Sequence, residues 1–378
     1  MEKWDKKKKT GIAMALSLSV STPALAYEVT EQLNFGSISS AVVQYGDFED
    51  VFTEEGKKRD AAAGGSFATD LWINFHPTEV DEFQMTLSYA AGNALNNINP
   101  FTLALYADDL EEDLKNINGR NRNYFLESWY KHTLEVGANA SLGVTVGIID
   151  STVYIDENVF ANDEISQFMN DTFVNSILAN LPSYDGGGIL EFESGNWQLK
   201  AVIMNSRNES ERSYMYYSGQ ASYKLESTLG EGNYRINGYM TSGDFMNAAA
   251  TSSDESLKGF GFSADQQLTE HLGVFARLGW QDDAAAVDHD QLYCGGVNIN
   301  GGLWSRIGDE IGIGYAYLKG AQGSGLDRTQ AFETYVRFAV LAYADFTLDI
   351  QYILDSSDGK DGASPEGTII GGRLSSYF

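Results

Sequence analysis

The residues of this chain that offer binding chemistry are charged or aromatic side chains placed between apolar neighbours. Arginine donates several hydrogen bonds, a carboxylate accepts them, and an aromatic ring offers a flat apolar face. Such groups suit a polar ligand that is held weakly and released unchanged. The candidate binding residues are Glu127, Trp129, Phe275, Arg277, Glu333, Arg337, Asp349 and Arg373.

Groups for catalysis or metal binding are scarce. Cys294 is the only cysteine, so the sequence predicts no disulfide, no metal site and no cofactor. No serine stands in a G-x-S-x-G nucleophile motif. We therefore predict that the protein is not an enzyme, and a hydrolase is an alternative that no motif supports. The acidic stretches 47–55 and 107–113 are more typical of solvated loops than of cation sites. The histidines are scattered, at His76, His132, His271 and His289.

Alternating sequence indicates the elements that position the candidate residues. Apolar residues recur at every second position, as in a β-strand with two different faces. Clusters of Gly, Asn, Asp and Ser separate these rows, and Pro77, Pro100, Pro182 and Pro365 fall at the boundaries. The pattern predicts one long antiparallel meander. The apolar rows lie in Phe67–Phe75, Phe83–Tyr89, Leu142–Ile148, Trp197–Ile203, Tyr234–Met240, Ile311–Tyr317, Phe332–Phe338 and Phe346–Tyr352.

The first 26 residues have the order of a cleavable secretory leader. Met1–Lys9 is rich in lysine, Thr10–Ser21 is small and uncharged, and Ala24-Leu25-Ala26 has the pattern of a cleavage site. The sequence therefore predicts a signal peptide over residues 1–26 and a mature domain over 27–378. The formal net charge of −28 argues against nucleic acid as a partner.

The mature part contains no apolar run long enough for a membrane helix. Its 21 tyrosines and 20 phenylalanines, many near strand ends, suit the aromatic girdles of a membrane barrel. At the end of the chain Ile370, Leu374 and Phe378 share one face, and a strand in lipid must be paired on both edges. We predict an all-β, transmembrane, antiparallel up-and-down barrel of about 16 strands, with 14 or 18 as alternatives. A soluble secreted all-β protein is the competing interpretation.

One segment breaks the β pattern. Between residues 162 and 180 the apolar residues recur at steps of three and four, which is helical spacing. Asn162 or Asp163 suits the start of a helix, and Pro182 follows its end. We expect a short helical loop that either folds into the lumen and narrows it or packs on the rim of the barrel.

Several of these segments, in this order, resemble the carbohydrate-selective porin family of bacterial outer membranes. The resemblance extends from about Arg122 to Phe378. It rests on Glu127–Tyr130, Gly147–Asp150, Ala161–Glu164, Gln167–Asn170, Ser263–Leu268, Gly273–Trp280, Asp309–Gly320, Glu333, Tyr335 and Asp349–Ile353.

The resemblance implies a channel for passive diffusion of mono- or oligosaccharides, without cofactor or chemistry. The implied partners are small sugars, outer-membrane lipid and the barrel-assembly machinery, which would read the strand ending in Phe378; the oligomeric state stays open. If the apolar row of each strand faces lipid, the eight candidate residues face the lumen. For each, the alternative is that inward charges pair across the wall. A general, weakly cation-preferring porin is the second functional hypothesis.

Overall fold

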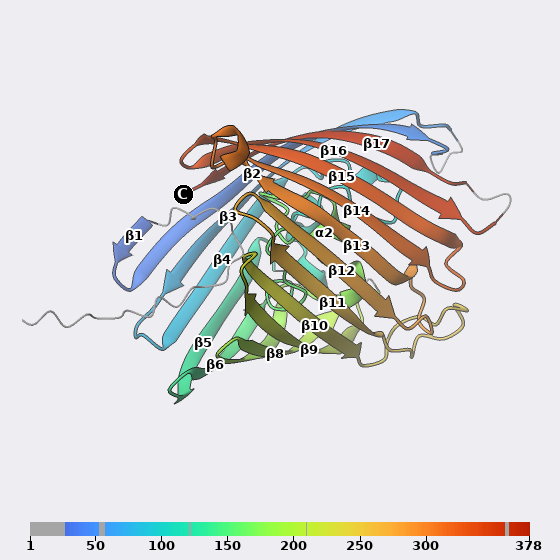
Figure 1. Cartoon of the computed structure of the whole chain (residues 1–378). Coiled ribbons are helices and arrows are strands. Elements are labelled where there is room, and N and C mark those ends of the chain that lie inside the picture. Colours follow the sequence, from blue (N-terminus) through green and yellow to red (C-terminus); the bar gives the residue numbers. More distant parts are fainter. Residues whose placement is uncertain (1–26, 53–56, 121, 209, 360–362) are drawn as a thin grey trace, which may run out of the picture.

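The structure is a closed antiparallel β-barrel (Figure 1). The computed structural model describes residues 27–52, 57–120, 122–208, 210–359 and 363–378, so the predicted leader lies outside the described residues. Sixteen strands, β2 to β17, each pair with the next, and β17 pairs with β2 to close the barrel. The predicted fold class and strand number are confirmed. Within the described residues, no helix has the length and apolar character needed to cross a membrane.

The strands differ widely in length, from a short β1 to the long β2. Their bounds are β1 Tyr27–Thr30, β2 Leu33–Glu49, β3 Ala61–Phe75, β4 Asp81–Ala91, β5 Phe125–Gly137, β6 Ala140–Ile149, β7 Asp185–Ser194, β8 Trp197–Arg207, β9 Ser213–Glu226, β10 Glu231–Thr241, β11 Lys258–Gln267, β12 Leu272–Gln281, β13 His289–Asn300, β14 Glu310–Gly320, β15 Leu326–Leu341, β16 Ala344–Ser357 and β17 Glu366–Tyr377.

The period-2 sequence pattern produces a wall with an apolar outer face. On β2, Val43 is 67% exposed and Tyr45 51% exposed, whereas their neighbours Val42 and Gln44 are buried. The same alternation runs along the other predicted rows, such as Leu348 and its neighbours on β16. Because the outer face carries apolar side chains, it suits lipid, and the alternate residues point into the lumen.

The last strand closes the barrel as the terminal sequence predicts. The backbone N–H of Ser37 donates to the carbonyl of Phe378 at 2.8 Å, and the N–H of Phe378 donates to Ser37 at 2.9 Å. Phe378 is exposed on the outer face with Leu374 and Ile370. The short β1 continues along the same edge of β2, opposite Phe35 and Leu33. No edge of β2 is left open along this seam.

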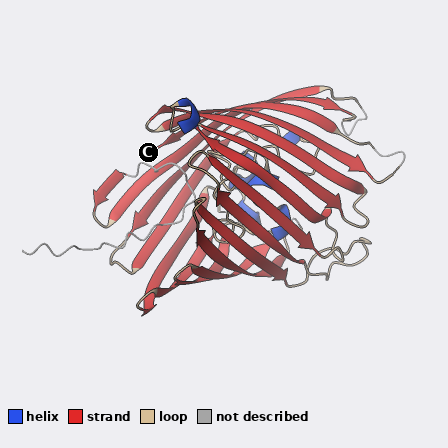
Figure 2. Ribbon diagram, viewed as in Figure 1, coloured by secondary structure: helices blue, strands red, loops and turns tan. Residues whose placement is uncertain are grey.

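Two long loops fold into the barrel (Figure 2). Loop 92–124 connects β4 to β5, and loop 150–184 connects β6 to β7. The short helices of these loops and of one turn are η1 Asn96–Ile98, α1 Glu111–Lys115, η2 Ile117–Gly119, α2 Asp171–Val174, η3 Ile177–Ala179 and η4 Gly301–Trp304.

The predicted short helical insertion is therefore confirmed, and of its two placements the lumen is the observed one. Its helical part is only α2 and η3, shorter than the spacing over 162–180 suggests. The reason is that wall side chains take up backbone groups of residues 164–170, which replaces the hydrogen bonds of a helix. The insertion of loop 92–124 is not predicted by the sequence pattern.

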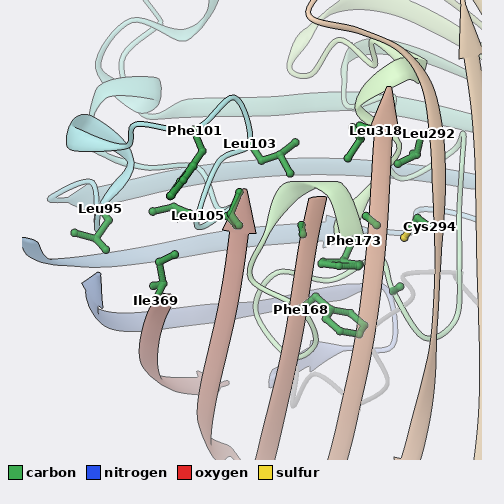
Figure 3. Close-up of a cluster of buried hydrophobic side chains, with 14 of the residues drawn as sticks. Leu95, Phe101, Leu103, Leu105, Phe168, Phe173, Leu292, Cys294, Leu318 and Ile369 are labelled. Carbon is green, nitrogen blue, oxygen red and sulfur yellow. The ribbon is translucent and has the colours of Figure 1, made fainter. Parts of the chain in front are cut away.

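A hydrophobic core lies inside the barrel, between these loops and the wall (Figure 3). Phe168 and Phe173 from loop 150–184 pack against Phe275 of β12, and the ring centroids of Phe168 and Phe275 are 5.6 Å apart. Leu103 and Leu105 extend this core from loop 92–124. One side of the lumen is thus packed like the interior of a soluble protein.

Candidate functional site in the barrel lumen

The eight candidate residues all lie on the inner face of the wall, but in two different settings. Glu127 and Trp129 lie on β5 and are partly exposed. The other six are buried and lie on strands β12 and β15 to β17: Phe275, Arg277, Glu333, Arg337, Asp349 and Arg373. The structure therefore brings six of them to one side of the lumen and two to the other.

Arg277 directs its whole guanidinium at loop 150–184. Nη1 donates to the carbonyl of Phe173 at 2.7 Å, and Nη2 donates to the carbonyl of Asp156 at 3.0 Å and to Oδ1 of Asn162 at 2.9 Å. Nε forms an ion pair with Oδ2 of Asp156 at 2.9 Å. The side chain is 0% exposed, so its donors are used by the loop.

Glu333 and Arg373 hold the same loop by its backbone. The carboxylate of Glu333 accepts from the N–H of Met169 at 2.5 Å and of Asn170 at 3.0 Å. Arg373 donates to the carbonyl of Glu164 at 2.5 Å and to that of Gln167 at 2.8 Å. Both side chains are fully buried, so they too contact loop rather than open lumen.

The remaining buried candidates contact the wall or the core. Arg337 pairs with Glu310 at 2.9 Å and with Asp345 at 3.6 Å, both on neighbouring strands. Asp349 accepts a hydrogen bond from Gln351 Nε2 at 3.1 Å. Phe275 packs in the hydrophobic core. The predicted alternative, pairing across the wall, describes Arg337.

The two inserted loops bind each other. The N–H of Ala107 donates to the carbonyl of Met169 at 2.9 Å, and the N–H of Ala104 donates to Oδ2 of Asp171 at 3.0 Å. Burial raises the pKa of Asp171 to about 7. Gln351 of β16 donates to the carbonyl of Leu105 at 2.9 Å and ties the pair to the wall. The loops thus form one packed unit, which we call the plug (residues 92–124 and 150–184).

The opposite side of the lumen keeps partly exposed polar groups. Trp129 Nε1 donates to Oε2 of Glu127 at 3.2 Å, and Thr86 donates to Oε1 of Glu127 at 2.9 Å. One step along β5, Lys131 pairs with Glu191 of β7 at 2.6 Å. Asp70 of β3 is partly exposed on the same side. Strands β3 to β7 therefore present an aromatic ring, carboxylates and a lysine beside the plug.

A β-bulge sets the direction of the β5 side chains. Thr86 lies opposite Glu127 but Leu87 lies opposite Phe125, so Leu126 is one extra residue. Strict alternation predicts Leu126 on the lipid face and Phe125 in the lumen. Instead Leu126 is 3% exposed and packs against the plug. The alternation rule fails here because the extra residue shifts the chain by one position.

The plug adds acidic groups that sequence reasoning placed elsewhere. Asp108 accepts from the hydroxyl of Tyr106 at 2.8 Å, and Asp109 accepts from the hydroxyl of Tyr184 at 2.5 Å. Burial and then the neighbouring Asp70 charge raise the pKa of Asp108 to about 7. The expectation of a solvated loop over 107–113 is therefore wrong for these two residues. The available signal was the apolar run just before them, residues 101–106, which anchors the loop in the core.

The described residues contain no cluster of three or more histidine, cysteine or acidic side chains arranged to hold a metal ion. Cys294 is a free, buried thiol. Among the described residues, Asp70, Asp108, Asp109 and Glu127 form no ion pair with lysine or arginine. The geometry offers hydrogen bonding, stacking and negative charge to a solute.

Comparison with known proteins decides the family. Residues 82–361 match the carbohydrate-selective porin, OprB family. The chain belongs to this family. A protein of Aquifex aeolicus (strain VF5), described as uncharacterized, is 32% identical over 298 residues, which cover 77% of this porin and 84% of that protein.

Solved structures share the architecture. The high-pH structure of Pseudomonas putida OprB has a TM-score of 0.72 at 16% identity and covers 92% of this porin and 94% of that chain. OccAB1 of Acinetobacter baumannii has a TM-score of 0.53 at 10% identity and covers 93% and 98%. At these identities the likeness shows the fold.

Family and fold together make the porin a carbohydrate-selective outer-membrane channel rather than an enzyme. The resemblance seen in the sequence is thereby confirmed. The contacts of the inward residues indicate which of them a solute can reach.

Proposed function

We propose that mono- and oligosaccharides cross the barrel passively along the inner face of β3–β6, beside the plug. The observation that carries this proposal is the partly exposed pair of Trp129 and Glu127, joined at 3.2 Å. On the opposite side of the lumen, the candidate residues from β12 to β17 are buried against the plug or the wall. We refer to the β3–β6 side as the passage.

The pair supplies what a sugar requires. The indole face of Trp129 covers the C–H surface of a pyranose ring, and the carboxylate of Glu127 accepts hydrogen bonds from hydroxyl groups. Gln84, beside Thr86 on β4, adds donors and acceptors. Such contacts are weak and spread over several positions, as a channel needs if it is to release its solute.

A cation preference in addition to sugar transport is supported by the unpaired acids of the passage. Asp70, Asp108 and Glu127 surround it without a partner arginine or lysine among the described residues. Their charge repels anionic solutes. A salt-gradient measurement of reversal potential reports this preference, and an anion-selective channel would contradict it.

The test of the sugar passage is substitution of the indole. We expect Trp129→Ala to weaken the block of ion current by added maltose about tenfold, since stacking contributes about 1–1.5 kcal/mol. Trp197→Ala is the matched control, because Trp197 lies 56% exposed on the outer face. Equal sugar block in parent and Trp129→Ala would refute the passage, and liposome swelling against amino acids of similar size tests the sugar preference itself.

We also infer the route to the membrane. The order of basic, apolar and small residues supports removal of residues 1–26, so N-terminal sequencing of the mature porin should begin at Tyr27. The exposed ring of Phe378 supports contact with lipid and recognition by the assembly machinery. Deleting Phe378 should lower the fraction of heat-modifiable barrel in the outer membrane, and an unchanged fraction would contradict that recognition.

A further inference from the structure

Three inward residues carry charges that could bind a solute, but their hydrogen bonds go to loop 150–184: Arg277, Glu333 and Arg373. We call these residues the clamps of the loop. We propose that they are positioning residues, which act on the solute only through loop 150–184 and thereby set the free cross-section of the passage. The proposal rests on the passage along β3–β6. Its direct readout is ion conductance, which requires no sugar.

The side chains of these three residues are not accessible to a solute. Arg277, Glu333 and Arg373 are each 0% exposed. A solute in the lumen would reach them only after loop 150–184 had left the wall. Their charge therefore acts on the loop, which covers them.

The three contacts are spread along the loop. Arg277 binds at Asp156, Asn162 and Phe173, while Glu333 and Arg373 bind four backbone groups between residues 164 and 170. A carboxylate takes the N–H groups and a guanidinium takes the carbonyls, so the irregular backbone is satisfied by the wall. The clamps thus replace the hydrogen bonds that a longer helix would have made itself.

Releasing one clamp leaves buried polar groups of the loop without their partners. Removing Arg277 leaves the buried carboxylate of Asp156 without its ion-pair partner and the carbonyl of Phe173 without its donor. An uncompensated buried charge is strongly unfavourable, so this part of the loop moves toward water. The water lies in the lumen, so the released loop moves from the β12 wall into the passage and narrows it.

The loop can be locked back onto the wall by a disulfide. A Cβ at Gly279 of β12 would lie 3.4 Å from the Cβ of Leu178, close to the separation in a disulfide. Gly279→Cys with Leu178→Cys, in a background that carries Cys294→Ala, therefore joins loop and wall. The two single-cysteine variants are the matched controls.

The experiment measures single-channel conductance in planar bilayers with and without dithiothreitol. We expect Arg277→Met to lower conductance about twofold, which a halved free cross-section would give. In Arg277→Met with the cysteine pair, the oxidised channel should return to the parent conductance and the reduced one should show the lowered conductance again. Arg277→Lys, which keeps the charge, should lie between parent and Arg277→Met.

Each result decides the proposal. Parent conductance in Arg277→Met with weaker sugar block would mean that Arg277 meets the solute directly. A rise in conductance, or a fall that the disulfide does not reverse, would also overturn the clamp. If Arg277→Met gives no heat-modifiable barrel, Glu333→Gln carries the same test, with the same direction expected and unchanged conductance again overturning it. Failure of the passage is separate, because it appears in the sugar block of Trp129→Ala and not in these conductances.

Discussion

The two sides of the lumen carry similar charged and aromatic residues, but these residues differ in burial and in their partners. On the β12–β17 side, arginines and acids are buried and hold the plug, whereas on the β3–β6 side Glu127 and Trp129 remain partly exposed. The buried residues of β12–β17 fix where the plug lies, and the proposed passage is on the other side. An inward charge on a barrel strand is therefore not evidence of solute contact until its partners are known.

The largest expected effect comes from the core of the packed side. Phe168→Ala should lower the free energy of unfolding by about 3–5 kcal/mol, because it leaves a cavity beside Phe173, Phe275 and Tyr335. Thermal loss of heat-modifiable mobility in detergent measures this change. Phe332→Ala, on the outer face of β15, is the matched control and should cost less than half as much. Equal losses in the two variants would mean that the lumen is not packed as described.

Breaking one ion pair on each side of the lumen provides a second comparison of stability. Arg337→Met leaves Glu310 and Asp345 buried without their ion-pair partner and should destabilise the barrel by about 3–5 kcal/mol. Lys131→Met breaks a pair whose lysine is 24% exposed but leaves the carboxylate of Glu191 buried, so its effect should be smaller than that of Arg337→Met without being negligible. Urea titration in detergent compares the two. A larger loss for Lys131→Met would reverse the assignment of packed and open sides.

The smallest effect is on charge selectivity and depends on pH. Because the pKa of Asp108 is raised to about 7, this carboxyl is neutral in mild acid and becomes charged as the pH rises through neutrality. Burial also raises the pKa values of the neighbouring Asp109 and Glu164 well above their ordinary range. Cation preference should increase between about pH 6 and pH 8, measured as reversal potential. Asp108→Asn should make this change less steep, and an equally steep change in that variant would exclude Asp108 as a contributor.

The sequence predicts the wall better than the contents of the barrel. Alternation is a local property, so the outer rows and the closing contact of Phe378 follow from it directly. Arg277 is correctly placed on the inner face, but its partners Asp156 and Phe173 are more than a hundred residues away and only the folded loop brings them close. Leu126 shows the remaining weakness, since a single extra residue reverses the face of the chain.

The closing seam has a consequence for assembly. Both of its strands also bind the plug: Arg373 on β17 holds loop 150–184, and on β2 Gln44 donates to the carbonyl of Leu105 at 2.9 Å. In a barrel that closed before the loops entered, water would take the place of these contacts, and in one that stayed open the loops would lack their wall. Docking of the loops therefore adds contacts to both strands of the closing seam, so the contents of the barrel stabilise its closure.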